Sequence, residues 1–542
     1  MARLMPENNR LPYALYRAEQ VRALDRGAID GFGIPGAELM ERAGHAAFVR
    51  ACARWPGARR MLVLAGAGNN GGDGYVIARL ALEQGWSVQL LTLGNHQQLR
   101  GEAAAAARAL TIAGGRSEPF RVLPQAVDVI VDALLGTGLE RPVAGDWAAA
   151  IEQVNASRAA VLAVDIPSGL HADSGRVLGC AVRADLTVSF IGLKQGMFTA
   201  QGPDCCGEIH FDALRVPAAI YAGQILAARR LDWRKEQELV PRRRPAAHKG
   251  DCGHVLVVGG APGLSGAPRL AGEAALRTGA GLVTIATHAS HAPLLNLIRP
   301  ELMVQGIADA AALAAVAQRA DVIAIGPGLG QDAWAQALFE HVLTLDKPLV
   351  VDADALNLLA AAPCRRETWV LTPHPGEAAR LLGCSIADVE QDRFSAVEAL
   401  QQRFDGVVVL KGAGTLIRGP GHRPVGLCSD GNPGMASGGM GDTLTGVIAA
   451  LLAQRCRLGA GAQPGPMTGL QLEQAATTGV CLHAAAGDRA ARDGQVGLLA
   501  GDLIDALRAT LASTMPAMTS TTAITTTTAP TAHPLNPAEE GA

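Results

Sequence analysis

Two series of short apolar, β-branched runs occupy most of the chain, and these runs lead into glycine-rich turns and Ala/Leu/Arg-rich helical patterns. Such alternation predicts parallel sheets covered by helices, and therefore an α/β fold with two domains. The expected strands of the first series are residues 61–65, 88–93, 127–133, 160–165 and 185–191. Those of the second are 282–287, 321–326, 348–352, 368–372 and 407–411, with helices expected over 72–84 and in the region 441–511.

The domain boundaries follow from changes in composition. Residues 223–247 are polar and punctuated by proline, so we expect a linker there between a first domain over 1–222 and a second over 248–511. A surface helix of the first domain is an equal alternative for the first half of this linker. The threonine-rich residues 512–542 contain few large apolar groups, which predicts a disordered tail. A flexible insertion is expected near residue 460.

Composition excludes several classes of protein. No apolar stretch reaches the ~20 residues that span a bilayer, and the charged start lacks the apolar core of a signal peptide. We therefore expect a cytoplasmic protein without a membrane partner. A net charge of -3 gives no electrostatic case for binding nucleic acid. The ten cysteines form no CxxC pair, so they are expected to be reduced and mostly buried.

A glycine-rich turn near residue 70 suits an anion. It lies between an expected strand and an amphipathic helix in LVLAGAGNNGGDGYVIARLAL, so amides and the helix dipole would face a bound phosphate. The turn matches neither GxGxxG nor a Walker A sequence, which argues against ordinary dehydrogenase or P-loop chemistry. Asn69, Asn70 and Asp73 are costly in a tight turn unless they cap the helix or bind a ligand, and capping alone is the alternative.

Two more strand ends carry carboxylates. Asp132 lies at a strand end in VDALLGTGLERPV, and Asp165 does so in VDIPSGL. Because ligands collect at the carboxyl ends of parallel strands, we expect both aspartates and the NNGGDG turn to face one crevice. Converging carboxylates repel unless a proton or cation lies between them, and oxygen donors from Asn70, Asp132 and Ser168 suit a hard cation. Turn capping is the alternative for each aspartate alone.

These motifs resemble the amino-terminal half of the bifunctional NAD(P)H-hydrate repair enzymes, an NAD(P)HX epimerase, and so does the opening EQVRALDRGAIDGFGIPGAELMERAG. The resemblance implies a Rossmann-like three-layer α/β/α domain. It implies that Asp165 is the acid/base that inverts C6 of the hydrate, and that K⁺ is bound by Asn70, Asp132 and Ser168. Besides Asp165, the implied hydrate contacts are Asn69, Asn70, Gly71, Gly72, Asp73, Gly136, Thr137, Gly138, Leu139, Glu140, Arg141 and Pro142.

The second half contains three further motifs. In NPGMASGGMGDTLTGVIAALLAQ, a helix is expected from Gly441, and its first amides and its dipole would face a phosphate. Asp442 would then be placed as a base beside that phosphate. The alternative is that the GxGD pattern is only an N-cap after a flexible loop. VVVLKGAGTLI brings Lys411, one of only five lysines, toward a phosphate or ribose, unless KGAG only turns a β-hairpin. LTPHPGEAARLLG carries His374 at a strand end, where binding and structural roles are equally expected.

The order of these motifs, from HKGDCGHVLVVGG to GGMGDTLTGVI, resembles the NAD(P)H-hydrate dehydratase domain, which is a ribokinase-like α/β fold. The resemblance runs from His248 to Asp505 and implies dependence on ADP with Mg²⁺. Implied nucleotide-binding residues are Lys411, Gly412, Ala413, Gly414, Thr415 and Gly441. Implied hydrate-binding residues are Ala267, Gly330, His374 and Asp442. The segment 458–470 is longer than the corresponding segment usually is in the family, and the tail has no counterpart there.

We therefore expect a bifunctional isomerase and lyase that repairs NADHX and NADPHX. The first domain would epimerise the R and S hydrates, and the second would dehydrate the S epimer to NAD(P)H while ADP gives AMP and phosphate. A small-molecule kinase is one alternative, because ribokinase-like folds share the GxGD arrangement. A first domain that only binds protein or RNA is another, although Asn70, Asp132, Asp165 and Ser168 together argue against it. We also expect a homo-oligomer.

Overall fold

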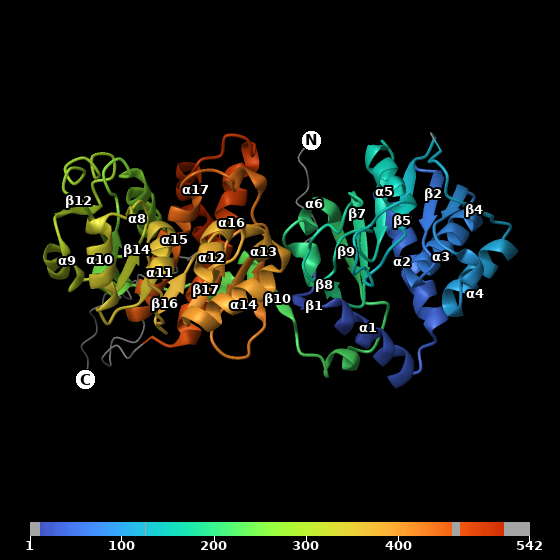
Figure 1. The fold of residues 1–542 in the computed structure, drawn as a ribbon, viewed down its shortest axis with the longest axis horizontal. Coiled ribbons are helices and arrows are strands. Elements are labelled where there is room, and N and C mark those ends of the chain that lie inside the picture. Colours follow the sequence, from blue (N-terminus) through green and yellow to red (C-terminus); the bar gives the residue numbers. More distant parts are fainter. Residues whose placement is uncertain (1–10, 125, 458–466, 514–542) are drawn as a thin grey trace, which may run out of the picture.

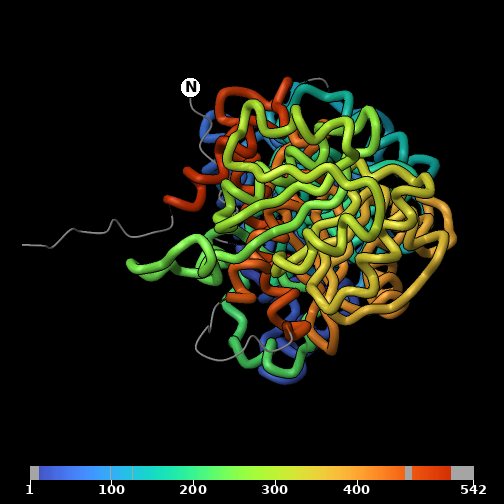
Figure 2. Tube along the Cα trace, turned by 90° about the vertical axis from the view of Figure 1, so that its left-hand side faces the viewer, coloured from blue at the N-terminus to red at the C-terminus, as the bar shows by residue number. Residues whose placement is uncertain are grey.

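The structure is a computed structural model that describes residues 11–124, 126–457 and 467–513. The insertion expected near residue 460 falls mainly, and the tail from residue 514 wholly, outside the described residues. Figure 1 shows two α/β bodies side by side, the N-terminal half on the right and the C-terminal half on the left. In Figure 2 the C-terminal half lies in front of the N-terminal half. Among the helices of the described chain, none is both long and apolar enough to cross a membrane.

The first half forms a seven-stranded sheet in the order β4-β3-β2-β5-β6-β7-β9, and all neighbouring strands are parallel. Its strands are β2 (Arg60–Ala65), β3 (Ser87–Thr92), β4 (Ser117–Pro119), β5 (Val129–Ala133), β6 (Ala160–Val164), β7 (Leu186–Phe190) and β9 (Glu208–Asp212). Its helices are α1 (Ala18–Arg26), α2 (Gly36–Arg54), α3 (Asn69–Glu83), α4 (Gly101–Ile112), α5 (Asp146–Ala156) and α6 (Gly202–Cys206). The five strands predicted here are all present.

Helices cover both faces of this sheet because its central strands are apolar on both sides. In β2, Met61 and Val63 belong to the core that includes residues of α2 and α3, whereas Leu62 and Leu64 belong to a separate core with Ile151 of α5. Successive side chains of a strand point to opposite faces, so one strand serves both cores. The predicted three-layer α/β/α arrangement is therefore confirmed.

The second half contributes nine strands to a twelve-stranded sheet in the order β13-β12-β11-β14-β15-β16-β17-β18-β19-β10-β1-β8. These strands are β11 (His254–Val258), β12 (Leu282–His288), β13 (Met303–Ile307), β14 (Val322–Ile325), β15 (Leu349–Val351), β16 (Trp369–Leu371), β17 (Val407–Leu410), β18 (Thr415–Arg418) and β19 (Val425–Cys428). The helices are α8 (Gly266–Thr278), α9 (Ala310–Ala317), α10 (Ala333–Leu343), α11 (Ala353–Ala361), α12 (Pro375–Leu382), α13 (Ile386–Gln391), α14 (Arg393–Phe404), α15 (Met440–Arg457), α16 (Gly469–Ala490) and α17 (Ala500–Ala512). The five predicted strands are again present.

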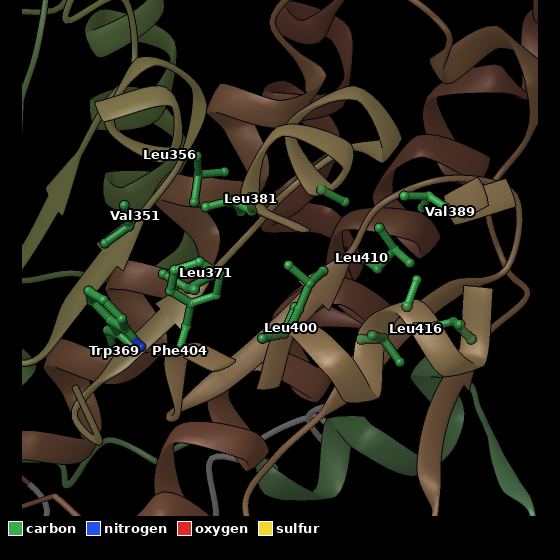
Figure 3. Close-up of a cluster of buried hydrophobic side chains, with 14 of the residues drawn as sticks. Val351, Leu356, Trp369, Leu371, Leu381, Val389, Leu400, Phe404, Leu410 and Leu416 are labelled. Atoms are coloured by element: carbon green, nitrogen blue, oxygen red, sulfur yellow. The ribbon is translucent and has the colours of Figure 1, made fainter. Parts of the chain in front are cut away.

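This second sheet is also buried on both faces. Val351 and Leu371 pack with Leu400 and Phe404 of α14 in one core, as Figure 3 shows, whereas Val350 faces a second core that includes α15 and α16. In sheet order, β13, β12, β11, β14, β15, β16 and β17 all pair in parallel with their neighbours. Strand β18 pairs antiparallel with β17 and β19. The loops after β11, β14, β15 and β17 therefore gather at one edge, where ligands of such sheets bind.

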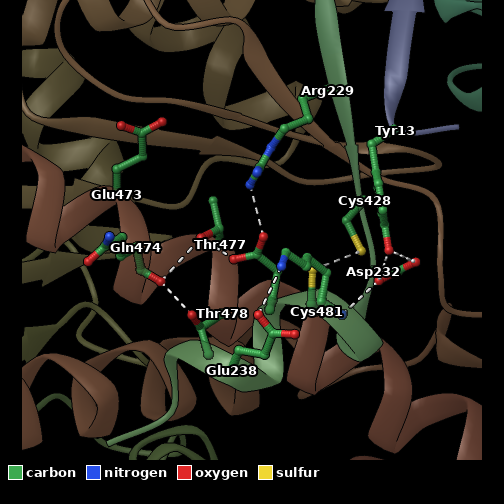
Figure 4. Close-up of polar contacts among 12 residues, drawn as sticks. Tyr13, Arg229, Asp232, Glu238, Cys428, Glu473, Gln474, Thr477, Thr478 and Cys481 are labelled. Carbon is green, nitrogen blue, oxygen red and sulfur yellow. Dashed lines mark hydrogen bonds and ion pairs between the residues drawn. The ribbon is translucent and has the colours of Figure 1, made fainter.

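The stretch predicted to be a linker, 223–247, is built into the second sheet. Its strand β10 (Ala228–Leu231) pairs with β19 on one side and with β1 (Ala14–Tyr16) on the other, and β1 pairs with β8 (Leu193–Lys194). Helix α7 (Trp233–Glu236) follows, and its Glu236 carboxylate accepts hydrogen bonds from Arg229 (2.9 Å) and Thr477 (3.1 Å) of α16 (Figure 4). The segment is thus neither a free linker nor a simple surface helix, while the exact domain boundaries stay a prediction.

Candidate active sites

The first site is a cavity of about 630 Å³ at the carboxyl ends of the strands of the seven-stranded sheet. Its walls come from α1, α2, the start of α3 and the segments after β5 and β6. The predicted residues that line it are Asn69, Asn70, Asp73, Gly136, Thr137, Gly138, Leu139, Glu140, Arg141 and Asp165. Gly71, Gly72 and Pro142, which were also predicted, are not among the described residues that line the cavity.

Asn69 to Asp73 form the first turn of α3, so this helix begins three residues earlier than predicted. Its N-cap, Gly68, has no side-chain cap, and Gly71 packs so closely that a Cβ there would lie 1.9 Å from the Gly66 carbonyl oxygen. Asn70 is buried, and neither its Oδ1 nor its Nδ2 forms a hydrogen bond with any residue that the structure describes. Because buried polar groups normally have partners, helix capping alone does not account for Asn70.

A buried lysine faces Asp165. Lys194, on β8, is fully buried; its ammonium forms an ion pair with the Asp165 carboxylate and donates to the Ser189 hydroxyl at 3.0 Å. Asp165 has a φ of 67°, a left-handed conformation that non-glycine residues adopt mainly where function requires it. Lys194 was not predicted as a site residue because it follows the apolar run of a strand, although it is one of only five lysines, which was an available signal.

Two further carboxyl groups lie near this ion pair. Burial and the negative charge of Asp165 raise the pKa of Asp25 to about 6, against the opposing effect of Lys194. Burial also raises the pKa of Asp73 well above its usual range, with Asp165 and Asp25 adding to the effect. One buried ammonium therefore faces three carboxyl groups, and the cluster retains exchangeable protons near neutral pH.

Asp132 and Ser168 form a hydrogen-bonded pair below the cavity. The Ser168 hydroxyl donates to Asp132 Oδ1 at 2.6 Å, and the Ser168 amide donates to Oδ2 at 2.8 Å. Burial outweighs the opposing effect of these hydrogen bonds and raises the pKa of Asp132 to about 6. The Leu135 amide donates to Ser168 Oγ at 2.8 Å, and a Cβ on the next residue, Gly136, would lie 3.3 Å from the Asn70 Cβ. The three predicted cation ligands thus lie in neighbouring positions at one edge of the sheet.

The second site is centred on another lysine–aspartate pair. Lys411 Nζ lies 2.7 Å from Asp352 Oδ1, and the Thr445 hydroxyl donates to Asp352 Oδ2 at 2.7 Å. Burial alone would raise the pKa of Asp352, but the Lys411 ammonium and the hydrogen bonds outweigh burial, so this pKa is lowered. Asp352 was not predicted as a site residue, although its place at a strand end in VVDADALNLL was a usable signal.

Asp442 and Glu377 lie beside the same ammonium. Lys411 Nζ is 3.8 Å from Glu377 Oε2, and Asp442 lies in the first turn of α15, as predicted. Burial raises the pKa of Glu377 to about 7 against the opposing effect of Lys411. Burial and the negative charge of Asp352 raise the pKa of Asp442 to about 7. Both groups can therefore accept or release a proton at neutral pH.

His374 combines the two roles that the sequence left open. Its Nδ1 accepts a hydrogen bond from the Gly376 amide at 2.9 Å, and its own amide donates to Glu377 Oε2 at 2.8 Å, so the residue caps α12. Burial and the nearby charge of Lys411 lower the pKa of His374, which keeps the imidazole neutral. The ring also lies within 3.4 Å of Glu377 Oε1 and thus beside the Lys411 cluster.

The KGAG motif turns a hairpin, since β17 and β18 pair antiparallel on either side of it. KGAG is therefore a hairpin turn, and Lys411 Nζ lies in the acidic cluster, 2.7 Å from Asp352 Oδ1 and 3.8 Å from Glu377 Oε2. Within the described part of the chain, the amide N–H groups of Gly412, Ala413 and Gly414 form no hydrogen bond, whereas the carbonyls of Ala413 and Gly414 do. Free amides on one turn form a concavity suited to an anion.

Ala267 and Gly330 lie in the segments that follow β11 and β14. Ala267 lies at the start of α8, and a Cβ on Gly328 would be 3.3 Å from the Ala267 Cβ. The Gly330 amide donates to Asp354 Oδ2 at 2.9 Å, which links the segment after β14 to the motif that contains Asp352. The predicted residues of the second site therefore come from loops at the same edge of the sheet.

Two family models match the chain. The one described as NAD(P)H-hydrate dehydratase matches residues 255–509, and the one described as YjeF-related protein N-terminus matches residues 36–196. The "Bifunctional NAD(P)H-hydrate repair enzyme Nnr" of Coxiella burnetii is 47% identical over 91% of this chain and 98% of its own. The chain belongs to this family of bifunctional NAD(P)H-hydrate repair enzymes. The Escherichia coli member of the same name is 45% identical over 92% of this chain and 94% of its own.

One solved structure of a similar protein is the ADP/ATP-dependent NAD(P)H-hydrate dehydratase of Bacillus subtilis, co-crystallized with ATP/Mg²⁺. It is 29% identical, covers 53% of this chain and 99% of its own, and has a TM-score of 0.44. The family models and these relatives confirm the predicted bifunctional NAD(P)H-hydrate repair enzyme, and the two sheets with their helices confirm an α/β fold in both halves. Potassium, the cytoplasm and the homo-oligomer stay predictions, as do the roles of single site residues.

Proposed function

We propose that the first site epimerises the R and S hydrates of NADH and NADPH, and that the second dehydrates the S epimer while ADP gives AMP and phosphate. The observation that supports this best is a buried lysine–aspartate pair in each half, Lys194 with Asp165 and Lys411 with Asp352. Each pair lies where open parallel sheets bind their ligands. Two such centres in one chain suit two successive reactions on one substrate.

At the first site, Asp165 exchanges a proton with the hydrate. Inversion at C6 is balanced if the hydroxyl loses its proton as the C6–N1 bond breaks to leave an aldehyde, and N1 then bonds to the other face of this carbon as the proton returns. This calls for an acid/base group beside the hydroxyl. The Lys194 ammonium pairs with Asp165, and burial raises the pKa of Asp73 well above its usual range, so that a protonated Asp73 limits the negative charge of the cavity. The amides at the start of α3 suit the pyrophosphate of the hydrate.

The residues at the first site fit a potassium ion. Asn70 Oδ1 is a buried acceptor without a partner in the described structure, and Asp132 is a fully buried carboxylate with Ser168 against it. Oxygen donors of this kind suit a hard cation. When bound, the ion would supply the positive charge that a buried carboxylate otherwise lacks. Asn70, Asp132 and Ser168 are the residues that would hold it.

At the second site, the amides of the turn 412–414 and of Gly441 hold the ADP phosphates beside Lys411. Asp442 takes the proton of the C6 hydroxyl as the hydroxyl oxygen bonds to the β-phosphorus and AMP leaves. The C6–O bond then breaks, phosphate departs, and loss of the C5 proton restores the C5–C6 double bond. A pKa of about 7 makes Asp442 a suitable base for the first step at neutral pH.

The acidic residues around Lys411 also fit Mg²⁺ brought by the nucleotide. Over the part of the chain that the structure describes, no group of three or more His, Cys, Asp or Glu residues is arranged to hold a metal by itself. Magnesium at phosphate-transfer sites is usually held by one or two carboxylates together with the phosphates, so Glu377 would suffice as the ligand from the protein and leave Asp442 free to act as the base. When bound, the ion would neutralise phosphate charge during transfer.

The experiment that tests this function follows products. With S-NADHX and ADP, we expect NADH, AMP and inorganic phosphate in equal amounts. With R-NADHX and no nucleotide, chromatography should show conversion to the S epimer, and Asp165→Asn should abolish it. A stable phosphorylated product without release of phosphate would instead indicate a kinase. Absence of epimer exchange in the unaltered protein would leave the first half without the proposed activity.

A further inference from the structure

The first half of the chain contacts the KGAG turn of the second half directly. Thr199, which follows a short 3₁₀ helix (Gln195–Phe198), is fully buried, and its hydroxyl oxygen lies 3.1 Å from the Ala413 carbonyl oxygen and 3.3 Å from that of Gly414. The Ala200 amide donates to the Ala413 carbonyl at 3.2 Å. Three donor–acceptor contacts thus join this segment to the turn.

The two backbones also approach each other closely. A Cβ on Gly414 would lie 2.1 Å from the Phe198 carbonyl oxygen, and Gly414 has a φ of +65°. Only glycine allows both this approach and this conformation without strain. The two segments are therefore closely packed against each other at this joint between the two halves.

Arg393 holds the same turn from the other side. This arginine of α14 is buried, and its Nη2 lies 3.2 Å from the Lys411 carbonyl oxygen and 3.5 Å from that of Gly414. The carbonyls of Lys411, Ala413 and Gly414 are therefore held by Arg393 from the second half and by Thr199 and the Ala200 amide from the first half.

Holding these carbonyls fixes the direction of the free amides. In a planar trans peptide unit, the C=O and the following N–H point in opposite directions. The unit with the Ala413 carbonyl carries the Gly414 N–H, and the unit with the Lys411 carbonyl carries the Gly412 N–H. Thr199, together with the Ala200 amide, thus directs the Gly414 N–H away from the joint, as Arg393 does for the Gly412 N–H.

We infer that Thr199, a residue of the epimerase half, is a positioning residue for the nucleotide-binding turn of the dehydratase half. The inference rests on the proposed function, since it assumes that the turn binds ADP. Thr199 does not touch the nucleotide and acts through the Ala413–Gly414 peptide unit. The adenine-nucleotide site is thereby completed by the other half of the chain.

The test measures ADP binding by calorimetry in the presence of Mg²⁺, using the full-length protein. Thr199→Val keeps the shape of the side chain but removes the donor, so we expect the Kd for ADP to rise about threefold to tenfold. Thr199→Ser keeps the hydroxyl and should bind ADP within about twofold of the unaltered protein. Thr187→Val is the matched control, because Thr187 is equally buried and its hydroxyl donates to the Cys206 carbonyl at 2.7 Å, away from the turn.

Kinetics separate positioning from a general structural role. Thr199→Val should raise the KM for ADP while kcat for dehydration at saturating ADP stays within about twofold, whereas a merely destabilised protein would lose kcat in both valine variants. An unchanged Kd in Thr199→Val, or an equal rise in Thr187→Val or Thr199→Ser, would overturn the inference alone. An unaltered protein that binds no ADP would overturn the proposed function together with it.

Discussion

Lys194 and Asp165 form a buried ion pair that connects the two sheets of the molecule. Asp165 follows β6 of the seven-stranded sheet, whereas Lys194 lies on β8, the last strand of the twelve-stranded sheet. Twenty-nine positions separate them in the chain. The acid/base centre proposed for epimerisation is therefore assembled from both sheets, and its geometry depends on the way the two halves join.

Replacing the buried lysine should disable one activity only. We expect Lys194→Met to slow epimerisation by about a hundredfold or more, because the Asp165 carboxylate loses its only paired ammonium among the described residues. Dehydration of pure S-NADHX by the same preparation should stay within about twofold, which also shows that the variant folds. Lys235→Met, at a half-exposed lysine, is the control. Epimerisation at the unaltered rate in Lys194→Met would refute the role of Lys194.

The reverse separation is expected at the second site. Asp442→Asn keeps the size of the side chain but removes the base, so dehydration should fall by about a thousandfold while epimer exchange continues. Both rates are measured on one preparation, by release of AMP and by chromatography of the epimers. Dehydration that persists in Asp442→Asn would show that another group removes the hydroxyl proton.

The dehydration step should depend on pH through Asp442. Its pKa is raised to about 7, and a base must be deprotonated, so kcat should fall about tenfold per pH unit below pH 7 and level off above it. Glu377 has a similar pKa, and Glu377→Gln distinguishes the two carboxyl groups. If Asp442 is the base, Glu377→Gln retains the acidic limb of the profile. A profile that becomes flat in Glu377→Gln would assign the limb to Glu377.

The effect of potassium on stability and on epimerisation should require Asn70. A cation that binds only the folded state raises Tm, so we expect KCl to raise the Tm and the epimerisation rate of the unaltered protein above those in choline chloride of equal ionic strength. Asn70→Leu removes the unpartnered oxygen and should abolish both increases. Stabilisation by KCl that persists in Asn70→Leu would place the ion elsewhere.

Much of the fold and several site residues could be predicted because their signals are local. The ten expected strands are apolar runs that end in turns, and every one is present. Asp165, Asp442 and Lys411 follow strands or begin a helix in glycine-rich motifs, and each lies at the predicted edge of its sheet. Short-range patterns therefore predicted where the motif residues lie in both candidate sites.

Features that depend on distant partners could not be predicted in this way. Strand β10 lies in a polar stretch, and it is ordered because β1 and β19 pair with it from opposite ends of the chain. Lys194 and Thr199 look like ordinary residues near a strand end, and their importance comes from Asp165 and the KGAG turn. A single sequence contains no local pattern that reports such pairings.

The most direct test of the proposed repair function is the recovery of reduced nicotinamide absorbance from a mixture of R- and S-NADHX. The protein is mixed with this substrate and Mg²⁺, with ADP, with ATP or without nucleotide. We expect recovery of the whole mixture with ADP and none without nucleotide, because epimerisation feeds the S-specific dehydration. Recovery that stops at the S fraction would contradict an active epimerase half, and no recovery with either nucleotide would contradict the dehydratase.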